Sequence, residues 1–467
     1  MGGREGQGPL RRRTGGRGGW LHPFLDRPAG ARDGGPALRP PGRSPADRGG
    51  SGPPRRGPAL RAVARWRAVP ASLRSAAAGR GAVGRGPAAR RRRQSPVPRL
   101  CQVRRLYRLA RPAIFRLDPE RSHGLSIAAL KSGLVPRADT PVDNRLRVAV
   151  AGIGFPNPLG LAAGYDKNAE VPDAALRLGF GFAEVGTITP KPQEGNPKPR
   201  VFRITAKEAI INRLGFNNQG HAEAFARLSA RARKPGIVGV NVGANKDAID
   251  RVADYVEGIN VFAPVASYLT INISSPNTPG LRALQSGSEL DRLLRSAVAA
   301  RDGYAALSGT AKTPLFLKVA PDLTEEQIEE IAGQVTRRGI DGMIVSNTTL
   351  SRAGVTGLPD ATEAGGLSGA PLAARATYVL ARFRKALGPD MPLIGVGGID
   401  SAAEAIRRIE AGADLLQLYT ALVYHGPELP GAILRGILRY LDRAGIDSLR
   451  ELRDRNVDAV LANPPVI

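Results

Sequence analysis

The sequence predicts an α/β protein in which eight short strands alternate with helices. Its strand candidates are nearly continuous apolar runs, typical of parallel strands buried on both faces, and helical patterns fill the gaps between them. Eight such units in about 290 residues match the number of units and the length of a (β/α)8 TIM barrel. We therefore expect a TIM barrel with a small N-terminal helical domain. An open doubly wound sheet is the alternative, but residues 161–166 lack its glycine-rich dinucleotide loop.

The first hundred residues differ in composition from the rest of the chain. Residues 1–99 contain 23 Arg, no Lys and four acidic residues, a net charge of +19. The whole chain carries +27, which leaves only +8 for residues 100–467. Few large apolar residues occur in the leading segment, so it cannot bury enough surface to offset chain entropy. We expect residues 1–103 to be a disordered, low-complexity extension rich in Arg, Gly and Pro.

Three interpretations of this extension remain open. The cluster Arg90–Arg93 suits a nucleic-acid-binding arm. A mitochondrial presequence would also be Arg-rich and acid-poor, but it would be amphipathic and Ser-rich, whereas Gly and Pro interrupt this segment throughout. We favour the third, GC-rich DNA translated upstream of the true start, because it yields Arg, Gly, Pro and Ala without Lys. No apolar segment of a secretory signal lies near the N-terminus.

Residues 104–140 are expected to form a helix pair. Apolar residues recur at helical spacing in two stretches that Asp118-Pro119 separates, and proline suits the start of the second helix. Arginines border the first helix, as in helices that lie on anionic membranes. From the residues alone, packing of the pair against its own domain is the favoured interpretation. The barrel should follow over residues 141–450, and residues 451–467 should form a C-terminal tail.

Composition argues against several kinds of site. Cys101 is the only cysteine, so the sequence offers no disulfide framework and no cysteine cluster for a metal. The four histidines are too scattered for a zinc site, and we expect no metal. No apolar run approaches the roughly 18 residues of a transmembrane helix.

Apolar runs locate the strands in order along the chain. They are expected at residues 159–163, 182–188, 237–242, 268–273, 315–319, 342–345, 393–396 and 415–419. Helical patterns cover residues 222–232, 284–300, 324–337, 373–386 and 402–410. The sequence Thr-Glu-Glu-Gln from Thr324 resembles a capping box at the start of the third of these helices.

Polar groups stand at the carboxyl end of every strand, where a TIM barrel builds its active site. The clearest case is the strand at 268–273, which Pro276 prevents from pairing further. Asn272, Ser275 and Asn277 are left there to grip a flat polar ligand. A turn that is rich in Asn, Ser and Pro by composition explains this stretch equally well. Polar residues at all the strand ends, two of them lysines, go beyond turn composition.

Glycines suggest a phosphate site near the end of the barrel. Gly397 and Gly398 precede a helix and would expose backbone N–H groups, which favour an anion. Phosphate sites of such barrels lie after strands seven and eight, and Gly369 with Tyr419-Thr420 would complete the cradle. No Walker-type Gly-Lys-Ser occurs, so we expect the phosphate of a bound cofactor.

Ten motifs occupy the strand ends in a fixed order. They read AAGYDKNAE, EVGTITPKPQEGNPKPR, NRLGFNNQG, VNVGANK, TINISSPNTPGLR, LKVAPDL, VSNTT, GGLSG, GVGGI and LLQLYTAL. Over residues 104–445 the chain thereby resembles the quinone-dependent, membrane-associated class two of the dihydroorotate dehydrogenase family. The leading hundred residues have no counterpart in this resemblance.

The resemblance implies a barrel that binds FMN and oxidises dihydroorotate to orotate in pyrimidine biosynthesis, with a membrane quinone as electron acceptor. It implies Ser275 as the catalytic base that takes the proton from substrate C5, while the hydride leaves C6. A free Ser is a poor base, so the site must stabilise its deprotonated state or relay its proton to water. Class one carries Cys at this position. The resemblance also implies that residues 104–133 form the mouth of a quinone tunnel, which reverses the preference for packing alone.

The resemblance further assigns the pocket residues. Substrate contacts fall to Lys167, Asn212, Arg213, Leu214, Gly215, Phe216, Asn272, Asn277, Asn347 and Thr348. FMN contacts fall to Ala163, Gly164, Tyr165, Asp166, Lys167, Thr187, Asn241, Asn272, Lys318, Ser346, Gly369, Gly398, Tyr419 and Thr420. In this scheme Lys318 stabilises the negative charge of the reduced flavin ring.

The implied setting is a monomer attached peripherally to the cytoplasmic side of a bacterial cell membrane, with the mitochondrial inner membrane as the alternative and no nucleic-acid partner. Two other functions remain open. An Arg-rich nucleic-acid-binding protein on a barrel scaffold would leave the polar strand ends without purpose. Another FMN barrel, such as a dihydropyrimidine or NAD-linked dehydrogenase, would differ in its substrate or electron acceptor.

Overall fold

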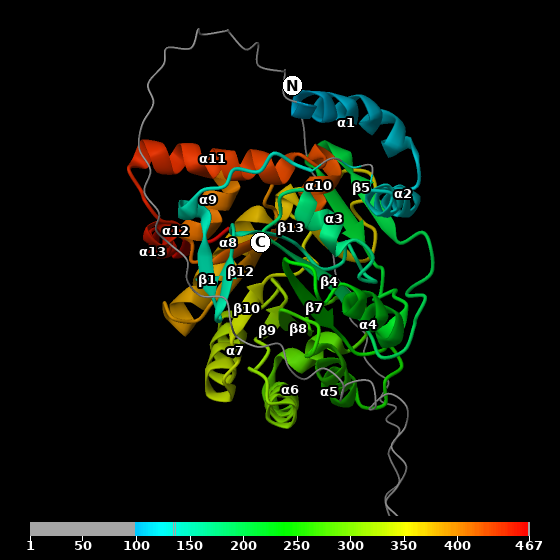
Figure 1. Ribbon diagram of the computed structural model, residues 1–467, viewed down its shortest axis with the longest axis vertical. Coiled ribbons are helices and arrows are strands. Elements are labelled where there is room, and N and C mark those ends of the chain that lie inside the picture. Colours follow the sequence, from blue (N-terminus) through cyan, green and yellow to red (C-terminus); the bar gives the residue numbers. More distant parts are fainter. Residues whose placement is uncertain (1–98, 134, 136, 466–467) are drawn as a thin grey trace, which may run out of the picture. The chain divides into compact units, whose positions relative to one another are not determined.

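The computed structural model describes residues 99–465 except 134 and 136, so the expectations for residues 1–98 lie outside it. Its central element is a closed barrel of eight parallel strands with helices around it (Figure 1). Around the barrel the order is β3-β4-β7-β8-β9-β10-β12-β13, and β13 pairs with β3 to close it. The expected (β/α)8 TIM barrel is confirmed.

All eight expected strands are present. They are β3 Leu159–Leu161, β4 Phe182–Ile188, β7 Ile237–Val242, β8 Tyr268–Asn272, β9 Leu315–Val319, β10 Gly342–Val345, β12 Leu393–Val396 and β13 Leu415–Leu418. Five have the expected bounds, and β3, β8 and β13 end one or two residues early. The early ends fall where the chain leaves the ladder to present side chains and backbone to the site described below.

Helices cover the outside of the barrel. They are α3 Pro172–Arg177, α4 Gly220–Ala230, α5 Arg251–Phe262, α6 Gly287–Ser308, α7 Glu325–Arg338, α8 Ala373–Leu387, α9 Ala402–Glu410, α10 Thr420–His425 and α11 Leu429–Ala444. The Thr324 capping box is present, because Thr324 and Gln327 bond each other's backbone N–H. Helix α6 starts later than expected, since residues Leu281–Gln285 form a separate 3-10 turn.

A hairpin that the sequence analysis did not predict closes the amino-terminal end of the barrel. It consists of β1 Val148–Val150 and β2 Ile153–Phe155. The Phe155 ring packs edge-on against Phe182, with 5.1 Å between centroids, in a cluster that includes Tyr268 and Phe316. This apolar plug leaves the carboxyl end of the barrel as the place for a cavity.

A second unexpected element is a three-stranded antiparallel sheet at the carboxyl end. Its strands are β5 Val201–Ile204, β6 Ala209–Asn212 and β11 Gly366–Gly369. Asn212, the last residue of β6, pairs with Gly366 of β11. The sheet thus carries Asn212 to the site from a segment inserted after β4.

The expected N-terminal helix pair is α1 Arg99–Arg116 and α2 Pro119–Lys131 (Figure 1). Asp118 caps α2 by accepting a hydrogen bond from Arg121 N–H at 2.9 Å. Helix α1 begins at Arg99, so the helix pair starts five residues before the expected residue 104.

The C-terminal segment is a packed part of the barrel domain. It forms α12 Leu449–Leu452 and α13 Val457–Leu461. Leu452 is fully buried, and Asn456 Nδ2 donates to Glu410 of α9 at 2.8 Å. A boundary at residue 451 therefore divides a helix that belongs to the domain.

Candidate active site

A cavity of about 670 Å3 lies at the carboxyl end of the barrel. The strand ends and the loops after them form its floor, and side chains of α1 and α2, among them Ile114, Phe115 and Leu125, form its far wall. One space therefore joins the polar strand ends to apolar helix faces. Its volume is that of a site for small organic ligands.

Most of the expected site residues line this cavity. They are Ala163, Gly164, Tyr165, Lys167, Thr187, Asn212, Leu214, Gly215, Phe216, Asn272, Ser275, Asn277, Lys318, Ser346, Asn347, Thr348, Gly369, Gly398, Tyr419 and Thr420. The barrel brings them together from strands that lie far apart in the sequence, because parallel strands all end at the same rim.

Three expected residues, Asp166, Arg213 and Asn241, do not reach the cavity wall. The Arg213 guanidinium pairs with Glu363 at 2.6 Å, away from the cavity. The Asp166 carboxylate accepts from two backbone N–H groups of its own loop, each at 2.8 Å. Asn241 accepts from Thr187 Oγ1 at 2.6 Å and lies behind it. These side chains support the wall, and the geometry does not favour direct ligand contact for them.

Ser275 lies in the loop that follows β8, close to the cavity. Its Oγ accepts a hydrogen bond from the Asn277 backbone N–H at 3.2 Å, and its side chain is nearly buried. In the described part of the chain no carboxylate, His or Lys bonds this hydroxyl. Asn277 Nδ2 in turn donates to Asn212 Oδ1 at 3.3 Å, so the Ser275 loop meets the inserted sheet.

A chain of side-chain hydrogen bonds runs across the ends of β4, β8 and β10. Asn272 Nδ2 donates to Thr187 Oγ1 at 2.8 Å. Ser274 Oγ donates to Asn272 Oδ1 at 2.7 Å and accepts from Asn347 Nδ2 at 2.8 Å. Each amide thereby has a fixed orientation, which presents preset donors and acceptors to a flat polar ligand.

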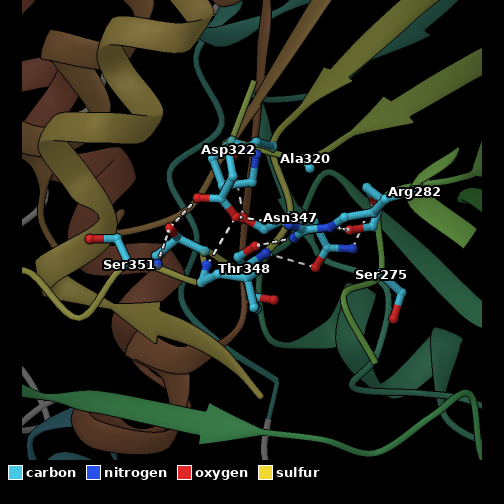
Figure 2. A network of polar contacts seen from close by, with 12 residues as sticks. Ser275, Arg282, Ala320, Asp322, Asn347, Thr348 and Ser351 are labelled. Carbon is cyan, nitrogen blue, oxygen red and sulfur yellow. Dashed lines mark hydrogen bonds and ion pairs between the residues drawn. The ribbon is translucent and has the colours of Figure 1, made fainter. Parts of the chain in front are cut away.

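Arg282 and Asp322 tie three of the active-site loops together (Figure 2). Arg282 pairs with Asp322, after β9, at 2.9 Å. It also donates to the carbonyl oxygens of Ser274, after β8, at 3.0 Å, and Thr348, after β10, at 3.1 Å. Sequence reasoning missed this pair as functional, although both residues lie in quoted motifs. Only the fold shows that their loops are neighbours.

Lys167 and helix α2 are electrostatically linked. Burial lowers the pKa of Lys167 to about 8; the carboxylate of Glu120 on α2 raises this pKa, and Arg200 lowers it. Arg200 is 6% exposed and pairs with Glu120 at 2.6 Å. Its Nη1 also holds the carbonyl oxygens of Glu194 at 2.7 Å and Asn196 at 2.8 Å. An ion pair therefore ties α2 to the segment that leads to the inserted sheet.

Lys318 reaches the cavity floor from the interior of the barrel. Burial lowers the pKa of Lys318, while the carboxylate of Glu184 raises it. Glu184 is fully buried and accepts from Asn241 at 2.8 Å, Tyr268 at 3.0 Å and Gln417 at 2.7 Å. This carboxylate balances the lysine charge. Sequence reasoning did not single it out, because a Glu inside an apolar strand reveals its partners only after the barrel closes.

An aromatic group that includes His123 of α2 lies where the cavity floor meets the helix pair. Burial, and secondarily the charge of Lys167, lowers the pKa of His123 to about 3, so its ring is neutral at pH 7. The rings of His123 and Tyr165 meet edge-on at 5.1 Å between centroids, and Tyr165 meets Tyr419 at 5.3 Å. This wall is uncharged and suits an apolar ligand.

The described residues contain neither a membrane span nor a cluster of metal ligands. No helix there is long and apolar enough to cross a membrane. No group of three or more His, Cys, Asp or Glu side chains in the same residues has an arrangement that would hold a metal ion.

The fold and the cavity define a barrel enzyme whose active site lies at the carboxyl ends of its strands. Residues 145–441 match the family described as dihydroorotate dehydrogenase. The chain is 62% identical over 351 residues to the dihydroorotate dehydrogenase (quinone) of Allorhizobium ampelinum, covering 75% of this chain and 96% of that relative. The same enzyme of Brucella ovis is 61% identical over 348 residues, covering 74% and 95%.

Solved structures agree with these relatives. The crystal structure of Eimeria tenella DHODH in complex with ferulenol superposes with a TM-score of 0.70 at 38% identity, covering 73% of this chain and 96% of that one. The chain belongs to the dihydroorotate dehydrogenase family. It is therefore an oxidoreductase that oxidises dihydroorotate in pyrimidine biosynthesis, and the family resemblance seen in the sequence is confirmed.

Proposed function

We propose that dihydroorotate is oxidised on FMN bound over the strand ends, and that the electrons pass to a membrane quinone that enters between α1 and α2. The observation that carries this proposal is the single cavity that runs from the polar floor to the apolar helix pair. The relatives from Allorhizobium ampelinum and Brucella ovis are named as quinone enzymes, which agrees with such an arrangement.

The chemistry of the floor fits FMN. Gly369 and Gly398 have φ angles of 97° and 72°, in the left-handed region that favours glycine. Gly398 lines the cavity shortly before α9, where backbone N–H groups favour a phosphate. Lys318, which lines the cavity, would supply a cation to stabilise the reduced flavin ring. FMN, when bound, would accept the hydride that the substrate loses.

The substrate would bind between the amide chain and Lys167. The Lys167 ammonium would pair with the substrate carboxylate, as a charge-assisted contact within a water-poor site. Asn212, Asn277 and Asn347 offer amide groups to the ring. The bond from Asn277 to Asn212 and the bond from Asn347 to Ser274 fix the direction of these amides. Ser275 would take the proton from C5, with Phe216 limiting access of water to the site.

The acceptor would use the helix pair. Leu109, Leu117 and Leu125 are 78%, 42% and 58% exposed on α1, on the turn after it and on α2. Exposed leucines beside arginines suit a helix pair that lies in the surface of an anionic bilayer. We propose peripheral attachment of a monomer to the cytoplasmic side of a bacterial cell membrane.

One purification tests the proposal. The flavin released by heating should chromatograph as FMN, in about one equivalent per chain. The purified enzyme should reduce a ubiquinone analogue with dihydroorotate and should leave NAD unreduced. A colourless protein, or turnover with NAD in place of quinone, would contradict the proposal.

A further inference from the structure

Arg408 on α9 is a fully buried cation without a carboxylate partner among the described residues. Burial, and secondarily the neighbouring charge of Arg407, lowers the pKa of Arg408 to about 9, so the guanidinium stays charged at pH 7. A buried charge that no opposite charge compensates is costly to keep. A bound anion near Arg408 would compensate this charge.

The guanidinium is held directly beneath the glycines that follow β12. Nη2 donates to the Gly397 carbonyl oxygen at 2.8 Å and to Ala373 O at 3.2 Å. Nε donates to Thr377 Oγ1 at 3.1 Å, and Nη1 has no partner in the described part of the chain. Gly395 makes room for the side chain, because a Cβ there would lie 2.5 Å from Arg408 Cγ.

The Gly397 carbonyl and the Gly398 N–H belong to one planar peptide and point in opposite directions. A charged donor on the carbonyl oxygen fixes this plane and polarises its N–H, since hydrogen-bonded groups strengthen one another. Gly398 lines the cavity, and its N–H has no protein acceptor among the described residues. A Cβ on Gly398 would lie 2.5 Å from Ala373 Cα, so backbone alone occupies this position.

We propose that Arg408 is a positioning residue that turns the Gly397–Gly398 peptide into a donor for a phosphate monoester, and so makes the barrel select FMN over riboflavin. Arg408 does not touch the ligand: it acts through the peptide and through its uncompensated charge. The inference rests on the proposed FMN site and adds the residue that gives this site its preference for a phosphorylated flavin.

A purely structural role predicts a different result. Arg408 also joins α9 to α8 through Ala373 and Thr377. Loss of these contacts between the two helices alone would lower stability and reduce the affinity for FMN and riboflavin equally. Loss of a phosphate-directed charge changes the affinity for FMN and leaves that for riboflavin, which has the same ring but no phosphate.

The test measures the Kd of FMN and of riboflavin for the flavin-free protein by quenching of flavin fluorescence. The readout is the Kd of riboflavin divided by the Kd of FMN. Partial unfolding raises both Kd values alike and so cancels from this ratio. Arg408→Met should lower the ratio by about tenfold or more, the loss expected for one charge-assisted interaction. The Kd of riboflavin should stay within about twofold, and Arg408→Lys should retain most of the ratio, since the charge remains.

Arg384→Met is the matched control. Arg384 is another buried arginine, 4% exposed on α8, but it pairs with Asp414 at 3.0 Å and does not bond the glycine loop. Its substitution should lower stability without changing the ratio. If Arg408→Met does not fold, Arg408→Gln replaces it, with the same expected loss.

The outcomes separate this inference from the proposed function. If Arg408→Met or Arg408→Gln folds and keeps the wild-type ratio, the proposed role of Arg408 is overturned and the proposed FMN site is unaffected. A wild-type protein that binds riboflavin as tightly as FMN overturns the phosphate site itself, and the role of Arg408 with it.

Discussion

Ser275 and Lys167 show how neighbouring groups define a residue's chemistry. Ser275 receives one backbone hydrogen bond and has no side-chain base beside it in the described structure. As the proposed base, Ser275 would therefore depend on the bound ligand for its deprotonation. Lys167 is the opposite case, because burial and three charged neighbours already shift its pKa before any ligand binds.

Ser275→Ala should remove the base and leave the cofactor in place. We expect reduction of the flavin by dihydroorotate to slow by about 10²–10⁴-fold, the usual contribution of a general base. Stopped-flow absorbance in a single turnover measures this step without the quinone. The flavin content of the variant is the control, and a near-normal rate would mean that another group takes the proton.

Affinity for orotate should depend on the charge of Lys167. Below its pKa of about 8 the ammonium is present and pairs with the orotate carboxylate; above that pH the pairing is lost. Affinity should therefore fall as pH rises through about 8, approaching tenfold per pH unit. Titrations followed by the flavin difference spectrum measure it. Lys167→Ala should bind orotate weakly, with a flat profile in this range, and a wild-type profile in that variant would refute the assignment.

Helix α2 is connected to the Ser275 loop by a series of contacts. Its Glu120 pairs with Arg200, which holds the Asn196 carbonyl. Asn196 Nδ2 donates to the Asn277 carbonyl at 3.1 Å, and Asn277 N–H bonds Ser275. The helix that forms the apolar wall thus also supports the loop that carries Ser275.

Glu120→Ala should weaken the packing of α2 and lower the free energy of unfolding more than substitution of an exposed residue on the same helix would. It leaves Arg200 buried with its charge unpaired, which should cost about 1–3 kcal/mol of unfolding free energy. Denaturant unfolding measures this cost, and quinone turnover should fall more than turnover with a small soluble acceptor.

Lys131→Gln is the matched control on the same helix. It breaks the ion pair between Lys131 and Glu170, whose atoms lie 2.6 Å apart. The Lys131 side chain is 53% exposed. Such an exposed pair contributes about 0–1 kcal/mol. Equal losses in the two variants would show that the buried pair has no special role.

At the scale of the molecule, the helix pair and the cofactor site are separate in sequence. The expected flavin contacts begin at Ala163, whereas α1 and α2 end by Lys131. In the proposed function the two half-reactions would therefore use different stretches of one chain, and both stretches line the cavity.

Two truncations should separate these stretches. Deletion of residues 1–98 should leave flavin content, turnover and membrane association unchanged, because the helix pair and the barrel remain. Deletion of residues 1–133 should keep FMN and its reduction by dihydroorotate, but should lose turnover with a long-tailed quinone and leave the membrane fraction. A small soluble acceptor is the control for misfolding. If the deletion of residues 1–133 keeps full activity with the long-tailed quinone, the helix pair only packs against the barrel and takes no part in quinone reduction.

Periodicity was sufficient to predict the barrel strands, because a parallel strand buried on both faces is a nearly continuous apolar run and differs from a surface element. The hairpin β1–β2 and the sheet β5-β6-β11 were missed. Their strands are three or four residues long, and β11 pairs with a strand more than 150 residues earlier in the chain. No local pattern identifies such a partner.

The sequence by itself determined the order of strands, the polar residues at their ends and, through ten motifs, the family. Only the tertiary structure decided which of those residues face the cavity. It placed Asp166, Arg213 and Asn241 outside the lining of the cavity, because the side chain of each bonds another residue of the folded chain. It also joined Arg282 to Asp322 and placed Arg408 beneath Gly397. Such contacts depend on which strand ends the closed barrel makes neighbours, and that is a property of the whole fold.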